Sequence, residues 1–83
     1  MLILQRGCVV RSLAGKDRDR LLVAVALDGQ AILLADGKER PLERPKRKNV
    51  RHVAATRFRL SEAEMATNRG LRRALAALEP EQR

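Results

Sequence analysis

The chain has few of the residues that build the common small frameworks. Its 83 residues include one cysteine, one histidine and one aromatic residue, Phe58. One cysteine cannot form an intramolecular disulfide, and one cysteine with one histidine cannot complete a structural zinc site. A single aromatic ring also argues against a platform on which the bases of single-stranded nucleic acid stack.

Long apolar segments are absent as well. The longest uninterrupted apolar run covers residues 21–27, whereas a membrane-spanning helix needs about 20 apolar residues. The apolar residues 1–4 are followed at once by Gln5 and Arg6, which does not fit a signal peptide. We therefore expect a cytoplasmic protein without a membrane segment, and its length predicts a single compact unit.

Positive charge is abundant and unevenly distributed. Eighteen lysines and arginines against ten acidic residues give a net charge of +8. Residues 44–59 carry +7 of this charge and contain no acidic residue, whereas residues 1–43 contribute +1 and residues 60–83 contribute nothing. Such a block favours a polyanionic partner. The alternative is a solvated, self-repelling loop.

Two Asp-Gly pairs predict β-hairpins. Asp28-Gly29 and Asp36-Gly37 are flanked by apolar residues, and Asp-Gly suits the type I′ turn of a two-residue hairpin loop. The hairpins would join strands at about 21–27, 30–35 and 38–42. The first of these strands alternates between a bulky face, which we expect toward the core, and a smaller face, which we expect under a helix.

Two further strands complete the predicted sheet. Residues 7–13 are short and rich in β-branched residues, and they end near Gly15, which allows a sharp bend. Residues 50–56 form a similar segment, and the prolines before them disfavour a helix. Five short strands with tight turns predict a mainly β fold, a small barrel, because closure removes exposed strand edges.

The C-terminal third predicts one amphipathic helix at about 62–78. Ser61 and Glu64 have the spacing of a capping box, and Leu60 and Met65 that of a hydrophobic staple. Pro80 predicts the end of the helix near Leu78. The helix would dock through one stripe of Leu71, Ala74, Leu75 and Leu78 and expose Arg69, Arg72 and Arg73 on the other side. We thus divide the chain into a barrel at 1–59, including the basic block, and a helix with a short tail at 60–83.

Three stretches of the chain resemble a known family. Residues 7–17 (GCVVRSLAGKD) and 21–25 (LLVAV) resemble the KOW motif of translation-protein SH3-like barrels, with Gly15 as its hallmark glycine. Residues 34–52 (LADGKERPLERPKRKNVRH) are similar to small bacterial KOW-domain RNA-binding proteins and to the KOW-barrel large-subunit ribosomal proteins of archaea and eukaryotes. Many KOW motifs have another glycine where this chain has residues 18–20. The resemblance covers about residues 6–56 and implies an SH3-like barrel that binds RNA in a ribosomal or translational setting.

The candidate RNA-binding residues fall into four groups. The phosphate contacts are assigned to the basic block, because arginine forks and lysine point charges match phosphate oxygens. Asn49 and His52 could bond ribose hydroxyls or base edges, although a satisfied sheet histidine is an equal alternative. The loop at residues 15–20 is assigned to RNA binding by the resemblance alone, and the arginines of the helix are assigned as a secondary patch. For each of these two groups the alternative is a solvated surface without a ligand. The full set is Lys16, Arg18, Arg44, Lys46, Arg47, Lys48, Asn49, Arg51, His52, Arg57, Arg59, Arg69, Arg72 and Arg73.

Little in the sequence supports catalysis. A Cys8/His52 dyad has no identifiable orienting acid, and no phosphate-binding glycine loop or metal triad accompanies it. We expect a monomeric, non-enzymatic RNA-binding protein, associated with ribosomal RNA or ribosomal particles, with no cofactor or metal. The alternatives are a protein-interaction KOW module of the transcription or translation machinery and a DNA-binding architectural barrel. Neutralising Lys46, Arg47, Lys48 and Arg51 together is expected to abolish RNA capture with almost no change in the thermal melt.

Overall fold

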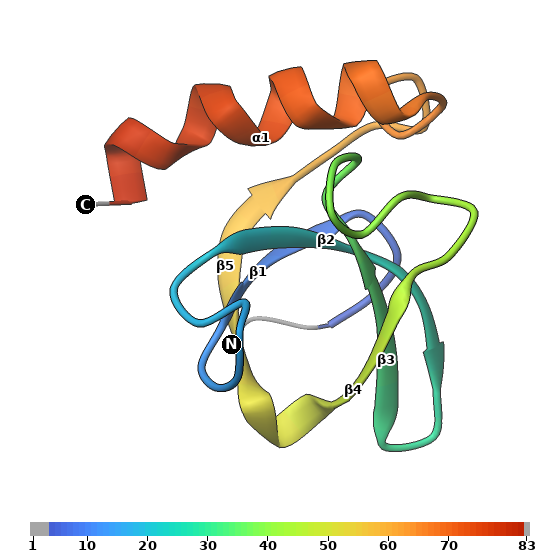
Figure 1. Ribbon diagram of the computed structural model, residues 1–83, viewed down its shortest axis with the longest axis vertical. Coiled ribbons are helices and arrows are strands. Elements are labelled where there is room, and N and C mark those ends of the chain that lie inside the picture. Colours follow the sequence, from blue (N-terminus) through green and yellow to red (C-terminus); the bar gives the residue numbers. More distant parts are fainter. Residues whose placement is uncertain (1–3, 83) are drawn as a thin grey trace.

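Five antiparallel strands and a C-terminal helix make up the fold. The computed structural model describes residues 4–82 (Figure 1). Its elements are β1 (Cys8–Ser12), β2 (Leu21–Asp28), β3 (Ala31–Ala35), β4 (Lys46–Asn49), the 3-10 turn η1 (Val50–His52), β5 (Val53–Arg59) and α1 (Asn68–Gln82). The strands form one sheet in the order β4-β3-β2-β1-β5. The predicted mainly β fold with one helix is confirmed, and the open sheet is compatible with a small barrel-like fold.

The hairpin between β2 and β3 forms at the first Asp-Gly pair. Asp28 pairs with Ala31, so the two-residue loop is Gly29 and Gln30. Only Gly29 has a positive φ, +62°. This is the requirement of a type II′ turn, with glycine first, and not of the predicted type I′ turn, which needs positive φ at both loop residues.

The second predicted hairpin, with a strand at 38–42, is wrong. Residues 36–45 form a loop, and the fourth strand is Lys46–Asn49, which pairs with β3. The Asp36 carboxylate accepts hydrogen bonds from the backbone N–H groups of Lys38 at 2.8 Å and Arg40 at 2.9 Å. These local bonds satisfy the donors that a strand ladder would have used.

The other predicted strands are displaced by a few residues. The first is Cys8–Ser12, within the predicted 7–13, and the last is Val53–Arg59 where 50–56 was predicted. Residues 50–52 form η1 instead, because the Asn49 side chain accepts the backbone N–H of Arg51 at 2.9 Å and caps the turn.

The core has two layers, one inside the curved sheet and one beneath α1. The inner layer is Cys8, Val10, Leu22, Ala24, Ile32, Leu34 and Val53. The layer under the helix is Val9, Leu21, Val23, Ala35, Met65, Leu71 and Leu75. The bulky face of β2 therefore packs under the helix and its smaller face lines the interior, the reverse of the prediction. Residues 21–24 are buried on both faces of the strand, so the difference in size could not identify the side that the helix covers.

The predicted helix start forms only as an isolated turn. Ser61 and Glu64 make the reciprocal bonds of the capping box, at 2.8 and 3.2 Å, and Leu60 and Met65 both pack in the layer under the helix. The continuous helix begins later, at Asn68, and its backbone continues through position 80 to Gln82. The predicted bounds of 62–78 are thus wrong at both ends. No helix within residues 4–82 is long and apolar enough to cross a membrane.

Candidate nucleic-acid interface

The basic strand β4 lies at an open edge of the sheet and presents its side chains to two sides. Lys46 pairs with Leu34 and Lys48 with Ile32. Directly paired residues point to the same face of a sheet, and both partners belong to the inner core layer. The two lysines therefore leave the strand on its inner side, whereas Arg47 and Asn49 leave it on the outer side.

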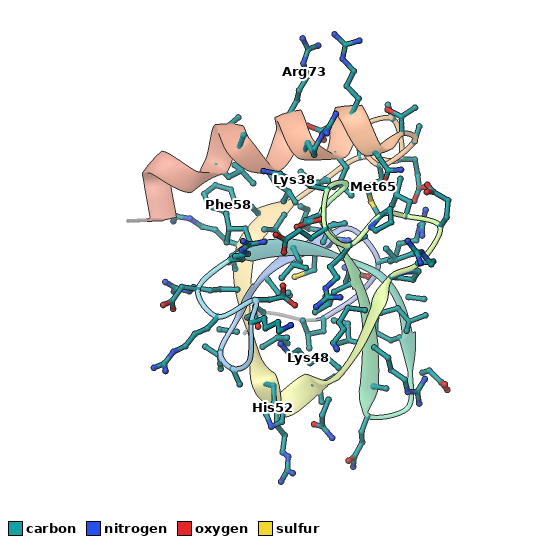
Figure 2. The ribbon with its side chains drawn as sticks, in the orientation of Figure 1. Lys38, Lys48, His52, Phe58, Met65 and Arg73 are labelled. Atoms are coloured by element: carbon teal, nitrogen blue, oxygen red, sulfur yellow. The ribbon has the colours of Figure 1, made fainter. Side chains whose placement is uncertain are left out.

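Lys48 crosses from this edge to the end of β1. Its Nζ donates to Ser12 Oγ at 2.7 Å and to the Ala14 carbonyl at 2.8 Å. Ser12 is fully buried, and Figure 2 shows Lys48 within the lower part of the sheet. An ammonium group has three donors, and two of them are used here. Lys48 thus links strand β4 to the loop that follows β1 and has one donor left for a ligand.

Next to Lys48, four segments line an open hollow of about 530 Å³, which we call the basic pocket. Its lining residues come from the loop after β1, the loop before β4, β4 itself and η1. They are Ala14, Gly15, Lys16, Asp17, Arg40, Lys46, Lys48 and His52. The structure therefore brings together four of the predicted RNA-binding residues, Lys16, Lys46, Lys48 and His52, and also the predicted hallmark glycine.

The one acid of the basic pocket is matched by an arginine. Asp17 is buried, and its Oδ2 lies 3.3 Å from Arg40. This ion pair joins the loop after β1 to the loop before β4. Arg40 offsets the charge of Asp17, the one acid among the lining residues, so no lining acid pairs with the exposed cations of the pocket, Lys16 and Lys46.

The remaining residues of the basic block do not share one surface. Arg44, Arg47 and Arg51 are exposed close to β4, and Arg47 pairs with Asp28 at 3.1 Å. Both members of that pair are largely exposed, so the interaction is weak. Arg57 and Arg59 lie at the far end of β5, which runs toward α1 (Figure 1). The cationic block of the sequence is thus divided between two ends of the molecule.

Arg18, Asn49 and His52, of which only His52 lines the basic pocket, differ in their surroundings. Arg18 is exposed on the loop after β1 but does not line the basic pocket. Asn49 uses its side-chain oxygen to cap η1, so that oxygen is committed to the backbone. His52 is exposed, and its carbonyl accepts the Leu13 N–H at 2.8 Å.

The helix arginines lie where the sequence predicted them. Leu71 and Leu75 are buried against the sheet, and Arg69, Arg72 and Arg73 are exposed. In Figure 2, Arg73 points away from the sheet at the end of the molecule opposite to His52. We call Arg69, Arg72 and Arg73 the helix patch.

The geometry does not favour Cys8 as a nucleophile. Cys8 lies in the inner core layer, whereas His52 is exposed. Burial raises the pKa of the Cys8 thiol above its ordinary value. A buried thiol that stays protonated is a poor nucleophile, since the thiolate is the reactive form.

Sequence reasoning missed Arg40 and the structural role of Lys48. Arg40 lay in a segment predicted as a strand, and its partner Asp17 is 23 residues away. Lys48 bonds residues that are 34 and 36 positions distant. No local pattern marks such pairs.

The chain has no match among protein-family models, and no curated protein matches it. The likeness to KOW proteins therefore depends on the residues quoted above and stays a prediction.

Proposed function

We propose that the protein binds RNA through the basic pocket and the exposed arginines beside it, as a non-enzymatic component of the ribosomal or translational machinery. The observation that carries this proposal is the convergence of Lys16, Lys46 and His52 from three separate segments on one hollow. A charged loop trailing in solvent would not produce such a convergence.

The chemistry of this surface suits a phosphate backbone. Lysine ammonium groups and arginine guanidinium groups donate to phosphate oxygens, and these contacts position a protein without reading sequence. Binding would release counterions condensed on the nucleic acid, which supplies much of the free energy at low salt. The preference for RNA over DNA, and the ribosomal setting, rest on the resemblance to KOW proteins.

Two matched charge variants test the proposed surface. K46Q/R51Q removes two exposed cations from β4 and the adjoining turn, and R11Q/R20Q removes one cation from β1 and one from the end of the loop before β2, neither of which lines the basic pocket. We expect K46Q/R51Q to bind a structured ribosomal RNA fragment about tenfold or more weakly, because hydrogen bonds to charged groups contribute about 1.5–3 kcal/mol each. R11Q/R20Q should bind nearly as the wild type does, as measured by fluorescence anisotropy at fixed salt.

An equal loss in the two variants would contradict the proposal, because it would show that only net charge matters. Competition by duplex DNA at the same salt tests the second part. We expect structured RNA to displace the labelled fragment at lower concentration than DNA. Equal competition would favour the architectural DNA-binding alternative.

A further inference from the structure

Helix α1 carries a second cationic surface on the side of the molecule opposite to the basic pocket. The three arginines of the helix patch are spaced i, i+3 and i+4, so their side chains share one face. Figure 2 shows Arg73 at one end of the molecule, with Lys48 and His52 toward the other. The Cα atoms extend over 28 × 27 × 26 Å.

The helix patch has no acidic partner among the described side chains. The ion pairs of that part of the chain are Arg6–Glu62, Arg20–Glu39, Arg40–Asp17 and Arg47–Asp28. The two acids that precede the helix, Glu62 and Glu64, are engaged elsewhere. Glu62 pairs with Arg6 at 2.9 Å, which lowers the pKa of the Glu62 carboxyl, and Glu64 completes the capping box.

The helix patch also weakens its own helix. No acidic residue occupies the first turn of α1, where Arg69 lies. A cation near a helix N-terminus opposes the helix dipole, and like charges three or four residues apart repel by a few tenths of a kcal/mol per pair. A bound polyanion would offset this unfavourable arrangement.

The helix holds these arginines on a fixed platform. Leu71 is fully buried and Leu75 nearly so. At the start of the helix, Asn68 accepts the Leu42 N–H at 2.8 Å and donates to Glu43 at 2.7 Å, which ties α1 to the loop before β4. The arginines are therefore presented with little freedom in their backbone.

The chemistry of the helix patch fits a phosphate backbone better than a protein surface. The cores of protein interfaces are enriched in apolar and aromatic side chains. The exposed large apolar residues of the described chain are Leu13 and Leu27, and neither lies on α1. Among the helix side chains that the structure describes, up to Leu78, the remaining exposed neighbours of the arginines are Ala76 and Ala77.

We propose that the protein bridges two RNA segments, one held by the basic pocket and the other by the helix patch. The first of these contacts rests on the function proposed above, and the second does not. A straight nucleic-acid segment cannot touch opposite ends of the molecule. At physiological salt the Debye length is about 8 Å, so ends separated by most of the molecular width attract their ligands independently.

A capture experiment tests the bridge. One short RNA hairpin is fixed to beads, and an identical fluorescent hairpin is added with the full chain. We expect the wild-type protein to retain the fluorescent hairpin on the beads. R69Q/R72Q/R73Q removes the helix patch while keeping residues that favour a helix, and K46Q/R51Q weakens the basic pocket. Each variant should still bind hairpin in solution but capture at least about tenfold less of the fluorescent one.

The outcomes separate this inference from the proposed function. Sedimentation of the wild-type complex should give one protein with two hairpins. A stoichiometry of one hairpin per protein, with R69Q/R72Q/R73Q binding as the wild type does, would overturn the bridge and leave pocket binding intact. A bridged complex holding two proteins would also overturn it, because self-association would then link the hairpins. Loss of solution binding in R69Q/R72Q/R73Q alone would instead overturn the proposed role of the pocket.

Discussion

Lys48 shows how one side chain of a basic run acquires a structural role. It is one of four cations between positions 44 and 48, yet its ammonium group bonds Ser12 and Ala14 across the open edge of the sheet. Lys46, two residues earlier on the same side of the strand, is exposed. The composition of the block does not distinguish the two lysines, but only Lys48 links two segments of the fold through its hydrogen bonds.

We therefore expect Lys48→Met to lower the free energy of unfolding by about 1–3 kcal/mol, because it removes the two charge-assisted hydrogen bonds from the ammonium group to Ser12 Oγ and the Ala14 carbonyl. The matched variant Lys46→Met should change it by less than about 0.5 kcal/mol, as is usual for exposed positions. Urea unfolding measures both. Equal effects of the two substitutions would contradict the assigned role of Lys48.

This role changes one expectation from the sequence. Neutralising Lys46, Arg47, Lys48 and Arg51 together was expected to leave the thermal melt almost unmoved. With Lys48 bonded to buried Ser12, the quadruple variant should melt at a lower temperature. K46Q/R51Q avoids this complication.

Among the structural elements, the loop at residues 36–45 differs most from its prediction. Gly37 has a φ of +80°, and a Cβ there would overlap the Asn68 carbonyl oxygen at the start of α1. The glycine allows the loop to lie against the start of the helix, and Leu42 of this loop packs against the core layer under α1. The same dipeptide that makes a hairpin at Asp28-Gly29 thus makes a contact between loop and helix here.

Gly37→Ala should consequently destabilise the protein by more than about 1 kcal/mol, since it combines an unfavourable φ with a steric clash. Gly29→Ala is the matched control, because it has a similar positive φ and open space around it. Thermal unfolding followed by circular dichroism should show the larger decrease in Tm for Gly37→Ala. A larger decrease for Gly29→Ala would contradict the close packing of this loop against α1.

Sequence patterns predicted correctly those elements that depend on residues close together in the chain. The strand at 21–27, the Asp28-Gly29 hairpin and the outward face of the helix arginines are in this class. The true start of α1 was not predictable, because the capping box at Ser61 is satisfied by a single turn. The basic strand β4 was not predicted as a strand either. It pairs with β3, and the paired residues are separated by 12 to 18 positions in the sequence.

At the scale of the whole molecule, the fold distributes a contiguous block of charge over two ends. Lys46 of β4 lines the basic pocket with Lys16 from the loop after β1, whereas β5 carries Arg57 and Arg59 toward the helix. The sequence identified most cations of the pocket from charge and resemblance. It could not identify Arg40 or the division of the block, because both depend on how the sheet curves.

The salt dependence of RNA binding tests the central claim most directly. If the wild-type protein engages about six phosphates, log K should fall with log salt with a slope of about −4 to −5, and K46Q/R51Q should have a slope shallower by about 1 to 2. Anisotropy titrations between low and physiological salt give both slopes. A wild-type slope near zero would contradict binding through the phosphate backbone, and an unchanged slope in K46Q/R51Q would contradict its assignment to the basic pocket.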